Sequence, residues 1–232
     1  MEQLAVVTGA SRGIGAATAE ALAAKGWHVV LTARTAKDLE AVEERIFAAG
    51  GSATIAPLDL LDGESIGRLA VAVKERWGKL DLLVLNAATL GTLSSVADID
   101  AKEFARTLTL NVGAQQALLA AFDPLLRRGD KPKVIGVTSS VGRRPRAYWG
   151  AYGASKAAFE GLLGSYAEEN QSVGKVAVAI VDPGATRTKM RARAFPGENE
   201  QTVKPPEVVA KQLVELAGQG FDSPHYERVR DE

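Results

Sequence analysis

A chain of 232 residues is long enough for one globular domain, and a hydrophobic fraction of 46% excludes disorder as a description of the whole. Its 28 basic residues balance 28 acidic ones, so the totals give no support for binding to nucleic acid or to an anionic membrane. The absence of cysteine excludes a disulfide framework, a Cys-ligated zinc and a thiol nucleophile, and we predict no metal site.

Short apolar or β-branched runs alternate with longer segments of helical spacing. Strands are predicted at residues 4–8, 28–33, 53–57, 80–85, 133–138 and 176–181, with a weaker candidate at 225–229. Helices are predicted at residues 13–25, 36–49, 62–77, 101–127, 151–171 and 206–217. Runs such as 82–85 are apolar on both faces, which is typical of parallel strands covered by helices on two sides. The alternation predicts a single α/β domain over residues 1–232 with a parallel sheet.

The first residues lack a basic segment followed by a long apolar run, and the sequence contains no apolar stretch of membrane-spanning length. We therefore expect a cytoplasmic protein that does not enter a membrane.

The first predicted strand runs directly into Thr8-Gly9-Ala10-Ser11-Arg12-Gly13-Ile14-Gly15, and a helix follows. Glycines let the backbone turn tightly and approach a phosphate, while the helix N-terminus presents free N–H groups to it. The segment predicts a dinucleotide-binding loop. The alternative is a tight strand-to-helix turn that holds no ligand.

The end of the second predicted strand bears on the type of dinucleotide. An acidic side chain there would accept hydrogen bonds from the ribose hydroxyls and repel a 2′-phosphate. The chain instead has Ala33 and Arg34, and Arg12 offers a second guanidinium for the same phosphate. We predict NADP(H) rather than NAD(H). The alternative is that both arginines are simply solvated.

Asp59 follows the third predicted strand and is short enough to accept a hydrogen bond from an adenine amino group. The competing interpretation places Asp59 in the N-cap region of the next helix, where Asp62 is the better candidate for the cap.

Tyr152 and Lys156 are four residues apart at a predicted helix N-terminus, so their side chains share one face. A nearby ammonium group favours the phenolate form of a tyrosine, which suits Tyr152 as a proton donor and acceptor for a carbonyl–alcohol pair. Ser139 ends the fifth predicted strand, thirteen residues before Tyr152. We expect Ser139, rather than the adjacent Ser140, to join them at the carboxyl edge of the sheet.

With these residues the chain resembles the short-chain dehydrogenase/reductase family. The matching motifs appear in the family's order over about residues 4–188: Thr8-Gly9-x-x-x-Gly13-Ile14-Gly15, Asp59, Asn86-Ala87, Asn111, Ser139, Tyr152-x-x-x-Lys156 and Pro183-Gly184-x-x-x-Thr188. The segment around Thr186 and Phe195 also looks like a bacterial subgroup known only by the general name of NADP-dependent oxidoreductases. That resemblance carries no substrate with it.

The resemblance implies a seven-stranded Rossmann-type sheet in the order 3-2-1-4-5-6-7, with helices on both faces. It implies hydride transfer between NADP(H) and a carbonyl or alcohol. Tyr152 would be the general acid/base, Ser139 would hold the substrate oxygen, and Lys156 would bind the nicotinamide ribose. Asn111 would keep a water in the proton relay, and Thr188 would contact the nicotinamide carboxamide. The expected cofactor-binding residues are Gly9, Ser11, Arg12, Gly13, Ile14, Gly15, Arg34, Asp59, Leu60, Asn86, Ala87, Tyr152, Lys156, Pro183, Gly184, Thr186 and Thr188.

The chain departs from the family pattern at two places. Ala88 stands where the family usually has glycine, and the end of the chain lacks the family's usual D-G-G closing pattern. The family's usual assembly is a homodimer or homotetramer built on the helices that hold Asn111 and Tyr152. Because of the second departure, we expect a dimer as readily as a tetramer.

A long segment interrupts the alternation after the sixth predicted strand, and we predict a substrate lid at residues 185–204. This segment and the residues before Tyr152 together carry a basic rim of seven cations: Arg143, Arg144, Arg146, Arg187, Lys189, Arg191 and Arg193. The rim would steer an anionic substrate or NADPH toward the site. The alternatives are a solvated surface or pairing with Glu198 and Glu200.

Three classes of function remain open. The leading one is an NADP(H)-dependent oxidoreductase acting on a small carbonyl or alcohol. The second is a binding protein that senses NADP(H) without turnover, and the third is an isomerase or dehydratase on the same fold. The intact set of Asn111, Ser139, Tyr152 and Lys156 favours the first, because a sensor has no need of a proton relay.

Overall fold

The computed structural model describes residues 3–173 and 175–230, so the ends of the predicted domain at 1–232 lie outside the described part. Its strands are β1 (Leu4–Thr8), β2 (His28–Ala33), β3 (Ser52–Pro57), β4 (Leu82–Leu85), β5 (Lys133–Val137), β6 (Ala177–Asp182) and β7 (His225–Arg228). They form one parallel sheet in the order β3-β2-β1-β4-β5-β6-β7. The predicted fold class and strand order are confirmed, including the weak last strand.

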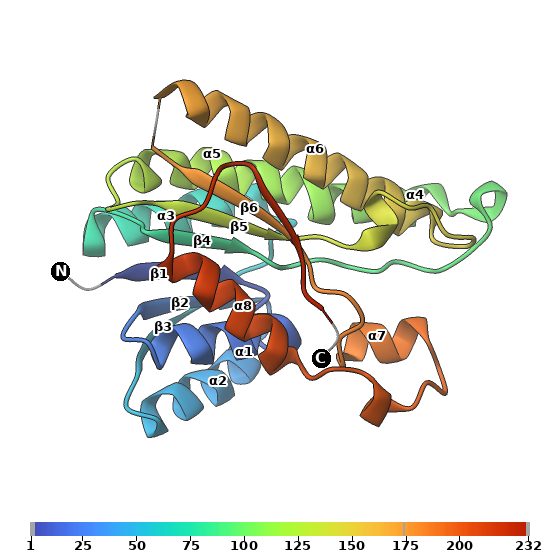
Figure 1. Cartoon of the computed structure of the whole chain (residues 1–232), viewed down its shortest axis with the longest axis horizontal. Helices are drawn as coiled ribbons and strands as arrows, with labels where there is room; N and C mark the ends of the chain where they lie inside the picture. Colours follow the sequence, from blue (N-terminus) through green and yellow to red (C-terminus); the bar gives the residue numbers. More distant parts are fainter. Residues whose placement is uncertain (1–2, 174, 231–232) are drawn as a thin grey trace.

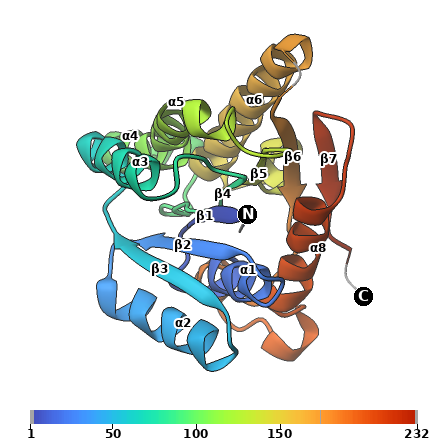
Figure 2. The ribbon, with the colours of Figure 1, turned by 90° about the vertical axis from the view of Figure 1, so that its left-hand side faces the viewer.

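Helices cover both faces of the sheet (Figure 1, Figure 2). One layer holds α1 (Gly13–Ala23), α2 (Ala36–Ala48) and α8 (Pro206–Gly218), and the other holds α3 (Gly63–Trp77), α4 (Ala101–Leu108), α5 (Ala114–Leu126) and α6 (Gly150–Val173). Each layer encloses its own core, because successive side chains of a strand point to opposite faces. In β1, Val7 belongs to the core under α1 and α8, and Val6 belongs to the core under α3 and α5.

Local sequence explains where the helices begin and end. In α3, Ile66, Leu69 and Val73 recur at helical spacing and are buried. The Asp62 side chain caps the first turn, and the helix ends at Gly78, whose φ of 72° is in the left-handed region.

One predicted helix is wrong as a continuous element. Residues 101–127 form α4, a π-helical turn η2 (Thr109–Gly113) and then α5. The extra residue in a π turn shifts the side chains after it around the helix axis, and such turns are often found at functional sites. Each of the other predicted boundaries either coincides with the observed one or differs from it by one or two residues.

The segment between β6 and α8 contains the short helix α7 (Lys189–Ala194) and the turn η4 (Glu200–Thr202). Its two ends are joined by a parallel bridge between Thr186 and Lys204 and by a 2.8 Å hydrogen bond from the Arg187 N–H to the Lys204 carbonyl oxygen. The predicted lid at 185–204 is therefore one closed excursion, visible beside the carboxyl ends of the strands (Figure 1).

Candidate active site

The strand order reverses between β1 and β4, and the segments that follow these two strands meet there. The Nδ2 atom of Asn86 donates to the carbonyl oxygens of Thr8 at 2.9 Å and Gly9 at 3.3 Å. The N–H groups of Asn86 and Ala87 donate to the Thr8 hydroxyl at 2.9 and 3.1 Å. Asn86 and Ala87 thus hold the glycine loop at the point where α/β sheets bind ligands.

The glycine loop forms a cradle that stays open because its glycines have no side chains. Gly9 and Gly13 have φ values of 66° and 56°, which glycine adopts without strain. A Cβ atom on Gly15 would lie 2.2 Å from the Gly9 carbonyl oxygen, and one on Gly13 would lie 3.2 Å from a methyl carbon of Thr188. The Arg12 side chain makes no capping bond to α1, so the first N–H groups of the helix are available. These features fit a phosphate group bound at the α1 N-terminus.

The predicted neighbours of that phosphate lie around the cradle. Ser11 is half-buried in the loop, and Ile14 packs against the core beneath α1. Arg12 and Arg34 are exposed, at the start of α1 and just after β2. Within the described part of the chain, neither guanidinium forms an ion pair, so both cations are free to meet a 2′-phosphate.

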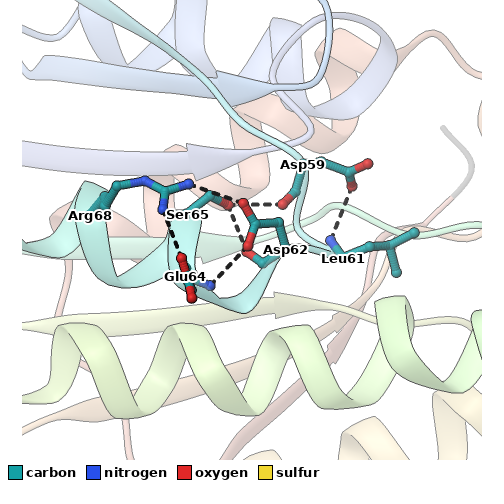
Figure 3. Close-up of polar contacts among 6 residues, drawn as sticks. All are labelled: Asp59, Leu61, Asp62, Glu64, Ser65 and Arg68. Carbon is teal, nitrogen blue, oxygen red and sulfur yellow. Dashed lines mark hydrogen bonds and ion pairs between the residues drawn. The ribbon is translucent and has the colours of Figure 1, made fainter.

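Asp59 lies in the loop between β3 and α3 (Figure 3). One carboxylate oxygen accepts a 3.0 Å hydrogen bond from the Leu61 N–H, and its carbonyl oxygen accepts from Ser65. Asp62 caps α3 by accepting from the Glu64 N–H at 3.1 Å, as expected for the better of the two candidates. Asp59 is exposed and adjoins the buried Leu60, and its adenine contact stays a prediction.

The catalytic candidates lie at the end of β5 and the start of α6. Ser139 follows β5 after Thr138, and its carbonyl oxygen accepts from the Gly142 N–H at 3.0 Å to begin the turn η3 (Ser140–Gly142). Tyr152 is the third residue of α6. A Cβ atom on Gly153 would lie 3.0 Å from the Val141 carbonyl oxygen, so η3 packs directly against the first turn of α6. This contact brings the Ser139 segment and Tyr152 to the same edge.

Burial shifts the pKa of both ionisable candidates. Tyr152 is 7% exposed and Lys156 is 3% exposed. Burial raises the pKa of the Tyr152 phenol, and the negative charge of Asp182 raises it further. Burial lowers the pKa of Lys156 to about 8, and the negative charge of Glu160 opposes this shift. The Lys156 ammonium donates a 2.8 Å hydrogen bond to the Val137 carbonyl oxygen.

Asn111 lies in the π turn and is 1% exposed. Its Nδ2 atom donates to the Thr89 carbonyl oxygen at 2.8 Å and to the Ser155 hydroxyl at 2.9 Å, and its Oδ1 atom accepts from the Thr89 N–H at 2.8 Å. The Ser155 hydroxyl donates in turn to the Tyr152 carbonyl oxygen at 2.7 Å. The side chain therefore ties the loop after β4 to the helix of Tyr152, and its water-holding role stays a prediction.

The loop after β6 also lies at the carboxyl edge of the sheet. The Gly184 N–H donates to the Asp182 carboxylate at 3.0 Å, and Gly184 has a φ of 65°. The Thr186 hydroxyl donates to the Pro183 carbonyl oxygen at 3.1 Å. The Thr188 hydroxyl accepts from the Arg191 N–H at 3.1 Å and caps α7, while its methyl group faces Gly13. Thr188 is thus a lid residue that faces the glycine loop.

The basic rim is partly paired. Arg191 makes two hydrogen bonds to Glu198, at 2.8 and 2.6 Å, which is one of the two expected acids. Arg143 instead pairs with Glu160 of α6, and Arg193 donates to the Gly91 carbonyl oxygen at 3.0 Å. The Arg146 guanidinium lies 4.9 Å from the ring centre of Phe195. Arg144, Arg187 and Lys189 are exposed.

Trp149 connects the catalytic helix to the lid. Its ring centre lies 6.0 Å from that of Tyr152 and 5.6 Å from that of Phe195 in the lid. The Trp149 ring therefore lies between Tyr152 of the catalytic helix and Phe195 of the lid.

Sequence reasoning missed three polar residues that support the site. The Gln115 amide donates to the carbonyl oxygens of Ala87 at 3.1 Å and Leu110 at 3.0 Å, joining the loop after β4 to the π turn. Thr138 and Glu160 bond to each other beside Lys156. For Gln115 and Glu160, the sequence signal was a polar residue at a helix position where the pattern predicts a buried one.

Comparison with known proteins agrees with this arrangement. A family model described as short chain dehydrogenase matches residues 3–199. The uncharacterized oxidoreductase YciK of Escherichia coli K12 is 36% identical over 208 residues, which cover 88% of this chain and 82% of that protein.

The similar solved structures include two that carry a cofactor. One is a short chain dehydrogenase of Escherichia coli CFT073 complexed with NADPH, which is 34% identical with a TM-score of 0.92 and covers 99% of this chain and 97% of its own. The other is a metagenomic short-chain oxidoreductase in complex with NADP, which is 35% identical with a TM-score of 0.84 and covers 99% and 98% of the two chains.

Across the described residues, every helix is too short or too polar to cross a bilayer. The fold, the motifs in their order and the comparisons agree, and the chain belongs to the short chain dehydrogenase family of nicotinamide-dependent oxidoreductases.

Proposed function

We propose that this protein transfers hydride between NADP(H) and a small carbonyl or alcohol substrate, with Tyr152 as the general acid/base. The observation that carries the proposal is the convergence of the Ser139 segment, Tyr152 and Lys156 at the end of β5, next to a glycine cradle that fits a phosphate. The free guanidinium groups of Arg12 and Arg34 support NADP(H) over NAD(H).

The bound nicotinamide supplies or accepts the hydride. In the direction of reduction, the Ser139 hydroxyl donates a hydrogen bond to the substrate oxygen, and the Tyr152 phenol donates a proton to it. The raised pKa of Tyr152 keeps that proton in place at neutral pH. The Lys156 ammonium stabilises the phenolate that remains and binds the nicotinamide ribose.

Asn111 and the lid complete the proposal. Both polar atoms of the Asn111 side chain are engaged with Thr89 and Ser155, so we propose that a relay water meets the main chain of the π turn. Residues 185–204 act as a substrate lid through the contact of Phe195 with Trp149.

We also propose that the protein is cytoplasmic and forms a homodimer or homotetramer through the surfaces of α4, α5 and α6. Light scattering behind a sizing column gives the mass of the particle and distinguishes the two assemblies. A monomeric mass at micromolar concentration contradicts this part of the proposal.

The test of the function has two stages. NADPH and NADH are titrated by fluorescence against wild type and Tyr152→Phe. Oxidation of NADPH is then followed with a panel of aldehydes and ketones. We expect tight NADPH binding by both proteins and turnover by wild type alone. Binding without turnover on the whole panel favours the sensor, and product formation without net NADPH consumption favours the isomerase or dehydratase.

A further inference from the structure

Glu160 is a buried carboxylate that the proposed reaction does not use. It lies on α6 one turn after Lys156, and residues four apart on a helix share a face. Its side chain is 10% exposed. A carboxylate removed from water to this extent is costly unless it is paired and hydrogen-bonded, so its partners indicate its purpose.

Both oxygens of this carboxylate are engaged with the segment that carries Ser139. Oε1 accepts a 2.7 Å hydrogen bond from the Thr138 hydroxyl. Oε2 accepts a 2.5 Å hydrogen bond from the Arg143 Nε atom, just after η3. The two partners flank Ser139 on either side, so Glu160 fixes both ends of the Ser139–Gly142 turn.

Lys156 is hydrogen-bonded to Val137, the residue next to the Glu160 partner Thr138. Its ammonium group donates to the carbonyl oxygen of Val137, directly before Thr138. Lys156 and Glu160 therefore hold consecutive residues at the end of β5, and their two opposite charges are buried side by side on one helix face. A Cβ atom on Gly142 would lie 3.3 Å from Glu160 Oε1, which shows how closely the turn packs on this pair.

We propose that Glu160 is a positioning residue for the reaction: its carboxylate holds the Ser139 turn and supplies the negative charge that keeps the buried Lys156 a cation. The proposal rests on the proposed function, because it assigns Lys156 the task of stabilising the Tyr152 phenolate.

Other titratable groups lie around this pair, and the exposed Glu168 lines the same surface hollow as Glu160 and Arg143. Tyr152 lies one turn before Lys156 on α6, and Asp182 at the end of β6 acts on Tyr152 and pairs with Arg228 at 3.4 Å. The Arg143 guanidinium, which pairs with Glu160, also lies over the ring of Tyr226 of β7, 4.2 Å from the ring centre. Glu160 is the acid on the same helix face as Lys156, and its charge raises a lysine pKa that burial lowers.

The first arm of the test measures the titration midpoint of Lys156 directly and does not depend on enzyme turnover. The full chain is labelled with ¹³C at the lysine ε carbons, and the Lys156 signal is identified by its loss in Lys156→Met. Lys133 is a second lysine whose pKa is lowered by burial, so this identification is needed. In Glu160→Gln we expect the titration midpoint of Lys156 to fall by about one pH unit.

The second arm measures the pH profile of NADPH oxidation. Glu160→Gln should approach the wild-type rate near pH 6, and its alkaline loss of kcat should begin about one pH unit lower. A purely structural role would lower the rate by the same factor at every pH. Glu160→Asp keeps the negative charge, so the titration midpoint of Lys156 should stay close to its wild-type value.

Two control variants separate the charge from the hydrogen bonds and from the fold. Thr138→Val removes one hydrogen bond and should leave the Lys156 midpoint unchanged. Glu168→Gln removes an exposed charge two turns further along α6 and should behave like wild type in both arms.

The outcomes distinguish the two proposals. An unchanged Lys156 midpoint in folded Glu160→Gln overturns the role of Glu160, whatever the enzyme assay gives. A midpoint that falls while Tyr152→Phe keeps full turnover overturns the proposed function and leaves the charge pairing established. If Glu160→Gln does not fold, Arg143→Met tests the pairing instead: removing the half-exposed cation that shares the Glu160 carboxylate should raise the Lys156 midpoint, and an unchanged midpoint contradicts the role of Glu160.

Discussion

The side-chain amide of Asn111 donates a 2.9 Å hydrogen bond to the hydroxyl of Ser155, which lies between Tyr152 and Lys156 on α6. This bond joins the π turn to the catalytic helix. Both residues are buried, so each would leave an unsatisfied partner if the other were removed.

Asn111→Leu should therefore destabilise the protein by about 1–3 kcal/mol, because it leaves the Ser155 hydroxyl and the Thr89 main chain without their partner. Urea unfolding measures this cost. The rate of catalysis should fall by more than the loss of folded protein accounts for, because the first turn of α6, which carries Tyr152, loses the bond between Ser155 and the π turn. Gln116→Leu, at an exposed position on α5, is the matched control. Full activity in a folded Asn111→Leu would contradict a role for this bond.

Lys156 should make stability rise with pH over a defined window. Its pKa is lowered from 10.5 to about 8, so between these values the unfolded chain binds more protons than the folded one. The free energy of unfolding then rises with pH through this window, and below it the full cost of burying the ammonium is present. The shift corresponds to roughly 3 kcal/mol.

The measurement compares wild type with Lys156→Met by urea unfolding from pH 7 to 9.5. The stability advantage of the methionine variant should shrink as pH rises. The raised pKa of Tyr152 acts in the opposite direction only above its ordinary value of 10.0, outside this range. A difference in the free energy of unfolding between the two proteins that stays constant across these pH values would mean that Lys156 is not the titrating group.

The fold was predictable because its signals are local. Runs such as Leu82–Leu85 are apolar on both faces, and glycine marks the end of helices such as α3 at Gly78. The cap at Asp62 was predictable for the same reason, because it depends on residues next to each other in the chain.

The interruption of the helix at Asn111 was not predictable. Residues Thr109–Gly113 include weak helix formers, but these do not by themselves specify a π turn. The contacts of the π turn with Gln115 and Thr89 form only in the folded chain. The partner of Arg143 was missed because Glu160 lies seventeen residues away and meets it only when η3 packs on α6.

Gly15→Ala should disrupt the cofactor cradle. The added Cβ would lie 2.2 Å from the Gly9 carbonyl oxygen and 2.6 Å from the Asn86 amide, so the loop must move. We expect NADPH binding to weaken by about tenfold or more, which is ~1.4 kcal/mol. Fluorescence titration gives the Kd. Gly67→Ala in α3 is the matched control, because its Cβ meets nothing within 4 Å and should stabilise the helix slightly.

Arg34→Ala tests the choice between the two dinucleotides. The exposed guanidinium after β2 is free of acidic partners among the described residues, so its removal should cost NADPH binding without affecting the fold. A charge-assisted hydrogen bond contributes about 1.5–3 kcal/mol, so the Kd for NADPH should rise roughly 10- to 100-fold. The Kd for NADH should stay unchanged, because NADH lacks the phosphate that this cation meets.

The control for this change is Lys37→Ala, which removes an exposed cation three residues further along the chain, at the start of α2. It should weaken NADPH binding only slightly, through the long-range field that salt screens. Arg12→Ala combined with Arg34→Ala should cost more than either change alone if both guanidinium groups meet one phosphate. A wild-type protein that binds NADH as tightly as NADPH, with Arg34→Ala indistinguishable from it, would show that both arginines are merely solvated.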